Sequence, residues 1–259
     1  MHLFRSILVF FLLTSINSFA NNEPFESTYY PLPQSNILFK GGNIYDGDGN
    51  EFLNTDVIIS NGVIVAIGED LPVSEDTIIK DVTGKWITPG IIDIHSHMGV
   101  YPAPGVSTSS DGNEATSPVT AEVWAEHSMW VQDPQYALAL AGGVTTFHVL
   151  PGSANLIGGR GVTVKNLQRN TINSMKFPDA PHSLKMACGE NPKRVYGNRG
   201  QMPSTRMGNV AGYRKAWIGA ENHKKRLERD PEHRDIKNET LVGVLDGKIL
   251  VHNLSLIHI

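Results

Sequence analysis

The sequence has little cysteine and no strong excess of either charge. Cys188 is its single cysteine among 259 residues, which excludes an intramolecular disulfide, so packing or a bound metal has to stabilise the fold. The 22 basic and 26 acidic side chains give a formal net charge of -4, so no basic surface for nucleic acid is expected. The most basic stretch, residues 222–234, mixes acids with its bases and is typical of a solvated helix face.

Long hydrophobic runs are absent except at the N-terminus. There an apolar run, residues 7–13, follows Arg5 and precedes Ser18-Phe19-Ala20, with small residues three and one positions before Asn21. This pattern predicts a signal-peptidase site, and the run is too short to span a bilayer. We therefore interpret residues 1–20 as a cleaved export signal and residues 21–35 as a linker. The expected protein is periplasmic or secreted, with no stable membrane insertion after cleavage.

Residues 36–88 consist of short β-like runs separated by turn residues. Two of these runs flank Asn61-Gly62, a strong hairpin signal because both central residues of a type I′ turn need positive φ. The segment is predicted to form a small β-sandwich.

From Ile91 onward, strand-like and helix-like segments alternate. Strands are predicted at residues 91–95, 144–149 and 183–189 and near 249–253. Helices are predicted from Asp133 and over residues 205–229, the second capped by Ser204. This alternation predicts a parallel α/β sheet, either open or closed into a barrel.

The stretch IIDIHSHMG, residues 91–99, places two histidines on one face of the first of these strands. Residues at i and i+2 of a strand point the same way, so His95 and His97 can converge on one ligand. Asp93 lies two residues before His95, so its side chain is expected on the same face of the strand, deeper than the two histidines. Neutral imidazoles are good ligands for Zn²⁺ and similar ions, whereas a pair hydrated by water is the simpler alternative.

A β-rich segment that runs through Thr88-Pro89-Gly90 into Asp93, His95 and His97 resembles the amidohydrolase superfamily, most closely its imidazolonepropionase-like exported members. The resemblance covers roughly residues 36–253. It implies an α/β fold with a TIM-like (β/α)₈ barrel behind the β-sandwich, of which residues 89–253 supply about the first half. It also implies a metal centre at the ends of the barrel strands, with His95 and His97 as ligands and Asp93 orienting them.

The same resemblance offers two candidates for the next ligand. In one branch of the superfamily a glutamate after a middle strand binds the metal, and Glu190 fits that pattern. In other branches a carboxylated lysine bridges two metals, and Lys185 lies within the same predicted strand. We favour Glu190 here, against the alternative of an ordinary loop acid. His252 lies near the place of a third histidine ligand.

The glycine-rich segment 150–161 does not open a helix in the manner of a dinucleotide-binding loop. We interpret it as a mobile loop over the barrel mouth, with Ser153, Asn155 and Arg160 near the substrate. A turn-rich connection is the alternative.

The function implied is a metal-dependent hydrolysis of carbon–nitrogen bonds in a small-molecule amide, cyclic or linear. One or two divalent ions, with Zn²⁺ the leading candidate, would activate a water molecule and polarise the carbonyl. An exported prolidase-like dipeptidase or a deacetylase would use the same centre. A catalytically silent binding protein is the alternative of another class.

The family pattern stops after Asn253, and residues 254–259, LSLIHI, match the translation of a transposon end used in sequencing adapters. We expect these residues to be a non-native tail and the chain to be truncated and inactive as written. His258 is accordingly not counted as a ligand.

The export signal yields the first prediction. N-terminal sequencing of the secreted protein should begin at or near Asn21, because signal peptidase cuts after Ala20. A mature protein that retains Met1 would rule out cleavage.

Overall fold

The computed structural model describes residues 24–256, with the side chain of residue 256 left aside. The predicted export signal and His258 lie outside these residues. Among the described residues, no helix is both long enough and apolar enough to cross a membrane.

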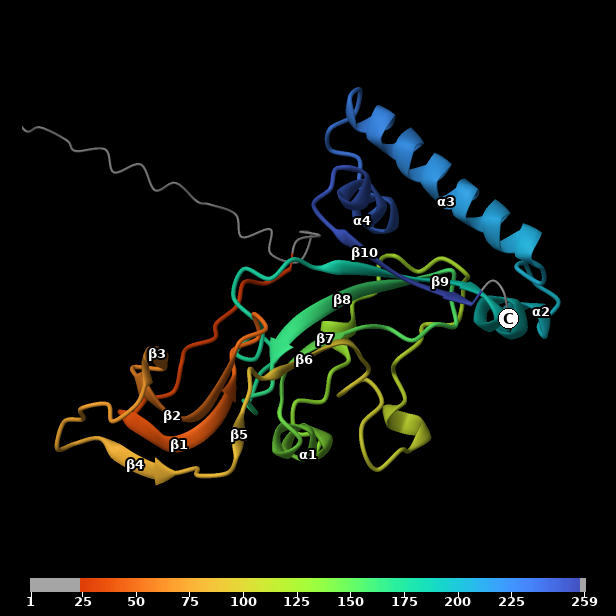
Figure 1. Ribbon diagram of the computed structural model, residues 1–259. Coiled ribbons are helices and arrows are strands. Elements are labelled where there is room, and N and C mark those ends of the chain that lie inside the picture. Colours follow the sequence, from red (N-terminus) through yellow and green to blue (C-terminus); the bar gives the residue numbers. More distant parts are fainter. Residues whose placement is uncertain (1–23, 257–259) are drawn as a thin grey trace, which may run out of the picture.

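The N-terminal part is a five-stranded sheet that projects from the rest of the chain (Figure 1). Its strands are β1 (Ile37–Tyr45), β2 (Glu51–Ser60), β3 (Val63–Gly68), β4 (Ile78–Asp81) and β5 (Trp86–Ile87). The order is β3-β2-β1-β4, and β5 also pairs with β1. Asn61 and Gly62 have φ of 52° and 76°, which confirms the predicted hairpin. The described strands of the expected sandwich thus make one sheet rather than two facing sheets.

The second sheet carries the histidines. It contains β6 (Ile91–Ser96), β7 (Val144–Val149), β8 (Ile157–Lys165), β9 (Ser183–Gly189) and β10 (Leu250–Leu256), in the order β10-β9-β8-β7-β6. Strand β6 is parallel to β7, and β9 is parallel to β10. The sheet curls as part of a barrel would (Figure 1), which confirms the predicted α/β class. Every residue of β9 is buried, as expected of a strand covered on both faces.

Strand β8 corrects the prediction of a mobile loop, because residues 157–161 lie at the centre of the sheet. It also breaks the predicted parallel order, since it runs antiparallel to both β7 and β9. Glycine is normally scarce in strands, but here it permits a close backbone approach. A Cβ on Gly159, whose φ is 113°, would lie 2.3 Å from the carbonyl oxygen of Val123. The neighbouring Arg160 amide donates to that same carbonyl at 2.7 Å.

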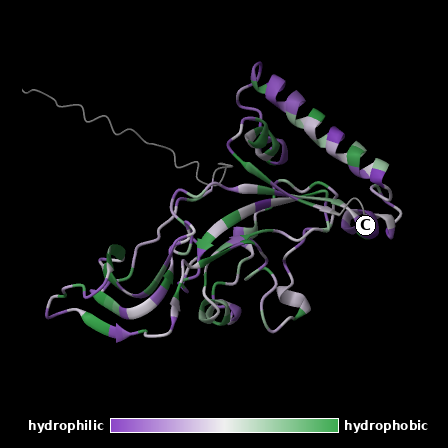
Figure 2. Cartoon of the chain, in the orientation of Figure 1, coloured by the Kyte–Doolittle hydropathy of each residue, from purple (hydrophilic) through white to green (hydrophobic). Residues whose placement is uncertain are grey.

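The described helices lie around the sheet (Figure 1). They are α1 (Gln135–Ala141), α2 (Glu190–Gly197), α3 (Arg206–Leu227) and α4 (Ile236–Leu245), with short 3₁₀ helices at Ser107–Ser109 and Ala125–His127. Helix α4 packs Leu241 into a core with Leu156, Leu184 and Ile249. In Figure 2, much of the ribbon of α4 and of the strands has the colour of hydrophobic residues, whereas α3 is hydrophilic over much of its length.

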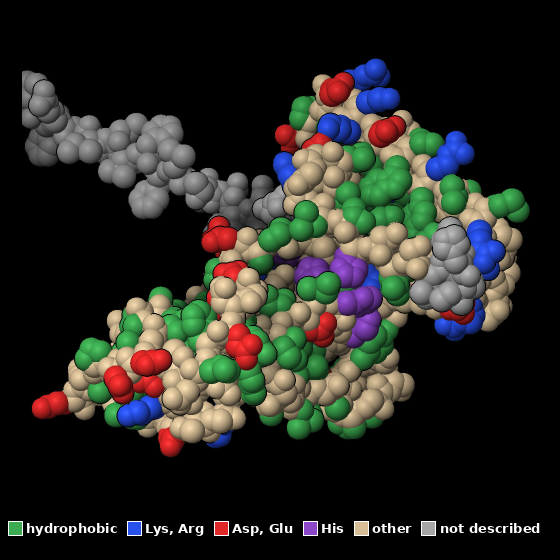
Figure 3. Space-filling model, in the orientation of Figure 1, with side chains coloured by type: hydrophobic (Ala, Val, Ile, Leu, Met, Phe, Trp, Pro, Cys, Tyr) green, Lys and Arg blue, Asp and Glu red, His purple; other side chains and the backbone are tan. Residues whose placement is uncertain are grey.

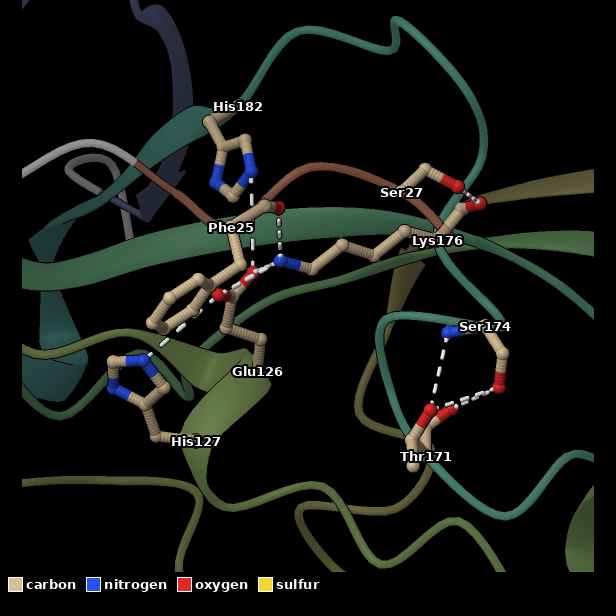
Figure 4. A network of polar contacts seen from close by, with 8 residues as sticks. All are labelled: Phe25, Ser27, Glu126, His127, Thr171, Ser174, Lys176 and His182. Atoms are coloured by element: carbon tan, nitrogen blue, oxygen red, sulfur yellow. Dashed lines mark hydrogen bonds and ion pairs between the residues drawn. The ribbon is translucent and has the colours of Figure 1, made fainter. Parts of the chain in front are cut away.

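A buried ion pair ties the N-terminal segment to this body (Figure 4). The Lys176 ammonium lies 2.9 Å from the Glu126 carboxylate, and both side chains are at most 5% exposed. The same ammonium donates to the carbonyl of Phe25 at 2.9 Å, and the Ser27 hydroxyl donates to the Lys176 carbonyl at 2.8 Å. The segment that precedes the first sheet is therefore fastened to the barrel half. Removing either charge would leave the other buried and unpaired.

The cap of α3 gives the second prediction. The structure corrects the predicted cap by one residue, because Thr205 and not Ser204 accepts the hydrogen bond from the Gly208 amide, at 3.0 Å. Thr205→Ala should lower the free energy of unfolding by about 1 kcal/mol in urea titrations, the usual cost of losing an N-cap. Ser204→Ala is the matched control and should change it by much less. Equal effects of the two changes would contradict this assignment.

Candidate active site

Three strands bring a lysine and three histidines together on the concave face of the curled sheet. Lys185 of β9 pairs in register with His252 of β10, so the two side chains leave the same face. His95 belongs to β6, which β7 and β8 separate from β9, yet its Nε2 lies 2.7 Å from the Lys185 amine. The curl of the sheet brings these two residues of non-adjacent strands together. Figure 3 shows histidine side chains gathered in a hollow of this face.

The imidazole rings of the cluster contact one another edge-on. The ring centroid of His95 lies 5.3 Å from that of His97 and 4.9 Å from that of His252. The Nδ1 of His97 donates to the carbonyl of Leu150 at 2.9 Å, which leaves its Nε2 as the nitrogen with a lone pair. The predicted pair of histidines and His252 thus meet in one cluster.

The electrostatics of the cluster favour neutral rings. Burial and, as the next largest cause, the nearby Lys185 together lower the pKa of His95 to about 4. Burial is also the main cause of the lowered pKa of His97 and of His252. Imidazoles that stay neutral at physiological pH keep a lone pair for a metal ion.

Lys185 is the least ordinary member of the cluster. Its side chain is fully buried, and burial lowers the pKa of the amine to about 8. A buried ammonium is costly without an anionic partner, and the partner present here is an imidazole nitrogen.

Glu190 is placed differently from what the sequence suggested. It is the first residue of α2, its side chain is 36% exposed, and its carboxylate pairs with Arg194 at 2.7 Å. A mid-strand position buries Lys185 among the histidines, whereas the strand end carries Glu190 to the surface. The structure therefore brings together the histidines and Lys185, the candidate that the sequence analysis ranked second.

Two further polar side chains support the cluster. The Asp93 carboxylate accepts from the backbone amide of His95 at 3.0 Å and so fixes the strand that carries the ligand pair. His148 of β7 has both ring nitrogens engaged, with Thr163 at 2.9 Å and Ser183 at 2.6 Å, while its ring stacks on that of His252. Because neither nitrogen is free, His148 packs against the cluster rather than ligating.

The residues expected near the substrate have structural contacts. Asn155 is 1% exposed and donates to the Thr120 hydroxyl at 2.7 Å. Arg160 is 4% exposed and lies over the ring of Trp124, 4.3 Å from its centroid. It pairs with Leu184, one residue from Lys185, so it leaves the opposite face of the sheet.

Ser153 lies in the connection between β7 and β8 and accepts from the Asn191 amide at 2.7 Å. Of the three residues expected near the substrate, it is therefore the one that is not held in the interior.

Sequence reasoning missed Tyr101, whose ring meets that of His97 edge-on with centroids 5.7 Å apart. The available signal was its position four residues after His97, where one loop turn brings the chain back over the strand end.

The cluster has nitrogen donors but lacks an acidic one. Within residues 24–256, no group of three or more His, Cys, Asp or Glu side chains is arranged to hold a metal ion. The chemistry of the donor set nevertheless fits a divalent ion if Lys185 supplies an anionic oxygen. Its burial against His95 places it where such an oxygen would be needed.

Comparison with known proteins assigns the family. No protein-family model matches the chain. Amidohydrolase tasK of Hapsidospora irregularis is 36% identical over 203 residues, which cover 74% of this chain and 20% of that protein. A dihydroorotase of Lactobacillus leichmannii is 43% identical over 84 residues, which cover 31% of this chain and 18% of that enzyme.

A crystal structure of an amidohydrolase from Thermotoga maritima MSB8 matches at 40% identity with a TM-score of 0.76, covering 84% of this chain and 57% of that one. The chain spans about a fifth of the length of the curated relatives it matches. It belongs to the amidohydrolase superfamily, as the sequence motif predicted. The imidazolonepropionase-like subgroup stays a prediction.

Proposed function

We propose that the protein carrying this chain hydrolyses carbon–nitrogen bonds of small amides at a divalent metal centre held by His95, His97, Lys185 and His252. The observation that carries the proposal is the contact between the buried Lys185 amine and His95 inside a cluster of neutral imidazoles. Lys185 replaces Glu190 as the proposed fourth ligand.

Carboxylation of Lys185 would supply the anion that the cluster lacks. The neutral amine adds to carbon dioxide, a nitrogen–carbon bond forms, and one proton leaves, so that the product is a carbamate with two oxygens. A buried amine with a lowered pKa is neutral more often than a solvated one, which favours this addition. The two oxygens of such a carbamate would suit either one metal ion or a pair of metal ions that it bridges. Zn²⁺ stays the leading candidate because its usual ligands are nitrogen and carboxylate oxygen.

A metal ion bound here would lower the pKa of a bound water molecule to about 7 and polarise the scissile carbonyl. Two other groups of the protein orient the proposed ligands. The Leu150 carbonyl fixes the tautomer and orientation of His97, and the Asp93 carboxylate holds the backbone of His95.

The proposed substrates are cyclic amides. Support comes from relatives named dihydroorotase and dihydropyrimidinase, which align over 131 residues or fewer of this chain. On the strength of the N-terminal export pattern, we further propose that the protein acts in the periplasm or outside the cell.

Metal content tests the ligand set. The full-length protein that contains this segment, purified without added metal, should hold at least one divalent ion per chain by elemental analysis. Lys185→Met, which keeps the volume but removes the amine, should lose most of that metal together with ring-opening activity on dihydrouracil. The pair His95→Ala and His97→Ala should do the same, with an unchanged circular dichroism spectrum.

Glu190→Gln is the control, because it removes a carboxylate that pairs with Arg194 at the surface. It should leave the metal content unchanged. A Lys185→Met protein with full metal content would contradict the proposed ligand set, and metal loss in Glu190→Gln would restore Glu190 as a ligand.

A further inference from the structure

His148 connects three neighbouring strands of the curled sheet. It pairs in register with Thr163 of β8, and its Nδ1 lies 2.9 Å from the Thr163 hydroxyl. Its Nε2 lies 2.6 Å from the hydroxyl of Ser183, which belongs to β9. Strands β7 and β9 are not neighbours, because β8 lies between them (Figure 1) and adjacent strands are about 4.8 Å apart. The imidazole of His148 therefore bridges β7 and β9 across β8.

This bridge lies on the face of the sheet that carries the proposed ligands. Ser183 is two residues before Lys185, so both side chains leave the same face of β9. A hydrogen-bonded link between β7 and β9 on the concave face favours bending of the sheet toward that face. The same bending brings His95 to within 2.7 Å of the Lys185 amine.

Gly161 of β8 leaves room for the bridge. It pairs in register with Ser183, and a Cβ at this position would lie 2.9 Å from the Ser183 hydroxyl oxygen and 2.6 Å from the side chain of Leu150. Real Cβ atoms do not approach so closely, so a larger residue at position 161 would displace the hydroxyl that His148 reaches.

The same imidazole lies against His252. The two rings are stacked, with their planes at 27° and their centroids 6.1 Å apart. The ring of His252 also meets that of His95 edge-on, so imidazoles from two different strands contact it. His148 cannot turn without losing its hydrogen bonds to Thr163 and Ser183, and Ser183 is only 3% exposed. A fixed neighbour of this kind restricts the orientations open to the His252 ring.

We propose that His148 is a positioning residue of the metal centre, which holds the ring of His252 and stabilises the curl that brings His95 to Lys185. The inference rests on the proposed function, because it takes these three residues as ligands. Groups behind a metal ligand orient it, and removing one typically lowers metal affinity about 10- to 100-fold.

Metal affinity tests the proposal in the full-length protein that contains this segment. The metal-free protein is titrated with Zn²⁺ in competition with a coloured chelator, and with Co²⁺ while the visible absorption, which reports ligand geometry, is recorded. His148→Leu should weaken Zn²⁺ binding at least about tenfold and change the Co²⁺ spectrum, because the ring of His252 is then no longer held.

His223→Leu is the matched control. It removes another imidazole that is 5% exposed and lies against a second histidine, His233, but on α3 and away from the cluster. It should change neither the Zn²⁺ affinity nor the Co²⁺ spectrum.

A second pair of variants tests the bridge while His148 stays in place. Ser183→Ala removes one end of the bridge and should weaken Zn²⁺ binding about fivefold, the usual effect of one hydrogen bond. Thr240→Val is its control, because it also removes a buried hydroxyl, one that donates to the Ile236 carbonyl within α4. It should leave the Zn²⁺ affinity unchanged.

Unchanged Zn²⁺ affinity in folded His148→Leu or in Ser183→Ala, or an equal loss in either variant and its control, would overturn the inference and leave the proposed ligand set standing. If His148→Leu does not fold, the comparison of Ser183→Ala with Thr240→Val decides. A wild type that binds no divalent ion would overturn the proposed function and this inference with it.

Discussion

The rest of this site depends on the contact between the Lys185 amine and His95. A fully buried amine 2.7 Å from an imidazole has a neutral neighbour where an ammonium would need an anion. The surrounding imidazole rings cannot supply that anion, because an imidazole is either neutral or cationic and burial favours the neutral form of these rings. The proposed carbamate on the lysine would resolve this conflict, because it would turn the amine into a negative group that a divalent cation can bind.

The curled sheet and its central strand place this contact. His95 and Lys185 lie on strands that are not neighbours, and they meet because the sheet bends around its concave face. Strand β8 spans the gap between them, and its glycines let the chain around Val123 pack directly on its backbone. Successive side chains of β8 and β9 point to opposite faces of the sheet. Lys185 therefore lies on the concave face and Arg160 under the outer layer.

The sequence was most informative where a local pattern determines the structure. The hairpin at Asn61-Gly62, the strand that carries His95 and ends next to His97, and the family were all predicted from short motifs. Strand β8 was not, because glycine normally argues against a strand, and the close backbone approach that requires it comes from residues far away in sequence.

Glu190 was ranked above Lys185 for a related reason, because the contacts that decide between them join residues far apart in the sequence. Spacing along the chain places Lys185 within β9 and Glu190 directly after it, and only the three-dimensional curl shows which of them faces the histidines. Asn155 and Arg160 were expected at the substrate because the glycine-rich segment 150–161 was predicted to be a mobile loop over the barrel mouth. Their burial depends on tertiary partners, Thr120 and Trp124, that no local pattern reveals.

Carbon-13 NMR of the full-length protein, prepared with labelled bicarbonate, tests the central claim most directly. The account predicts one protein-bound carbamate resonance in the metal-loaded wild type, absent from Lys185→Met and retained in Glu190→Gln. A wild type that holds its metal but shows no carbamate resonance would contradict it.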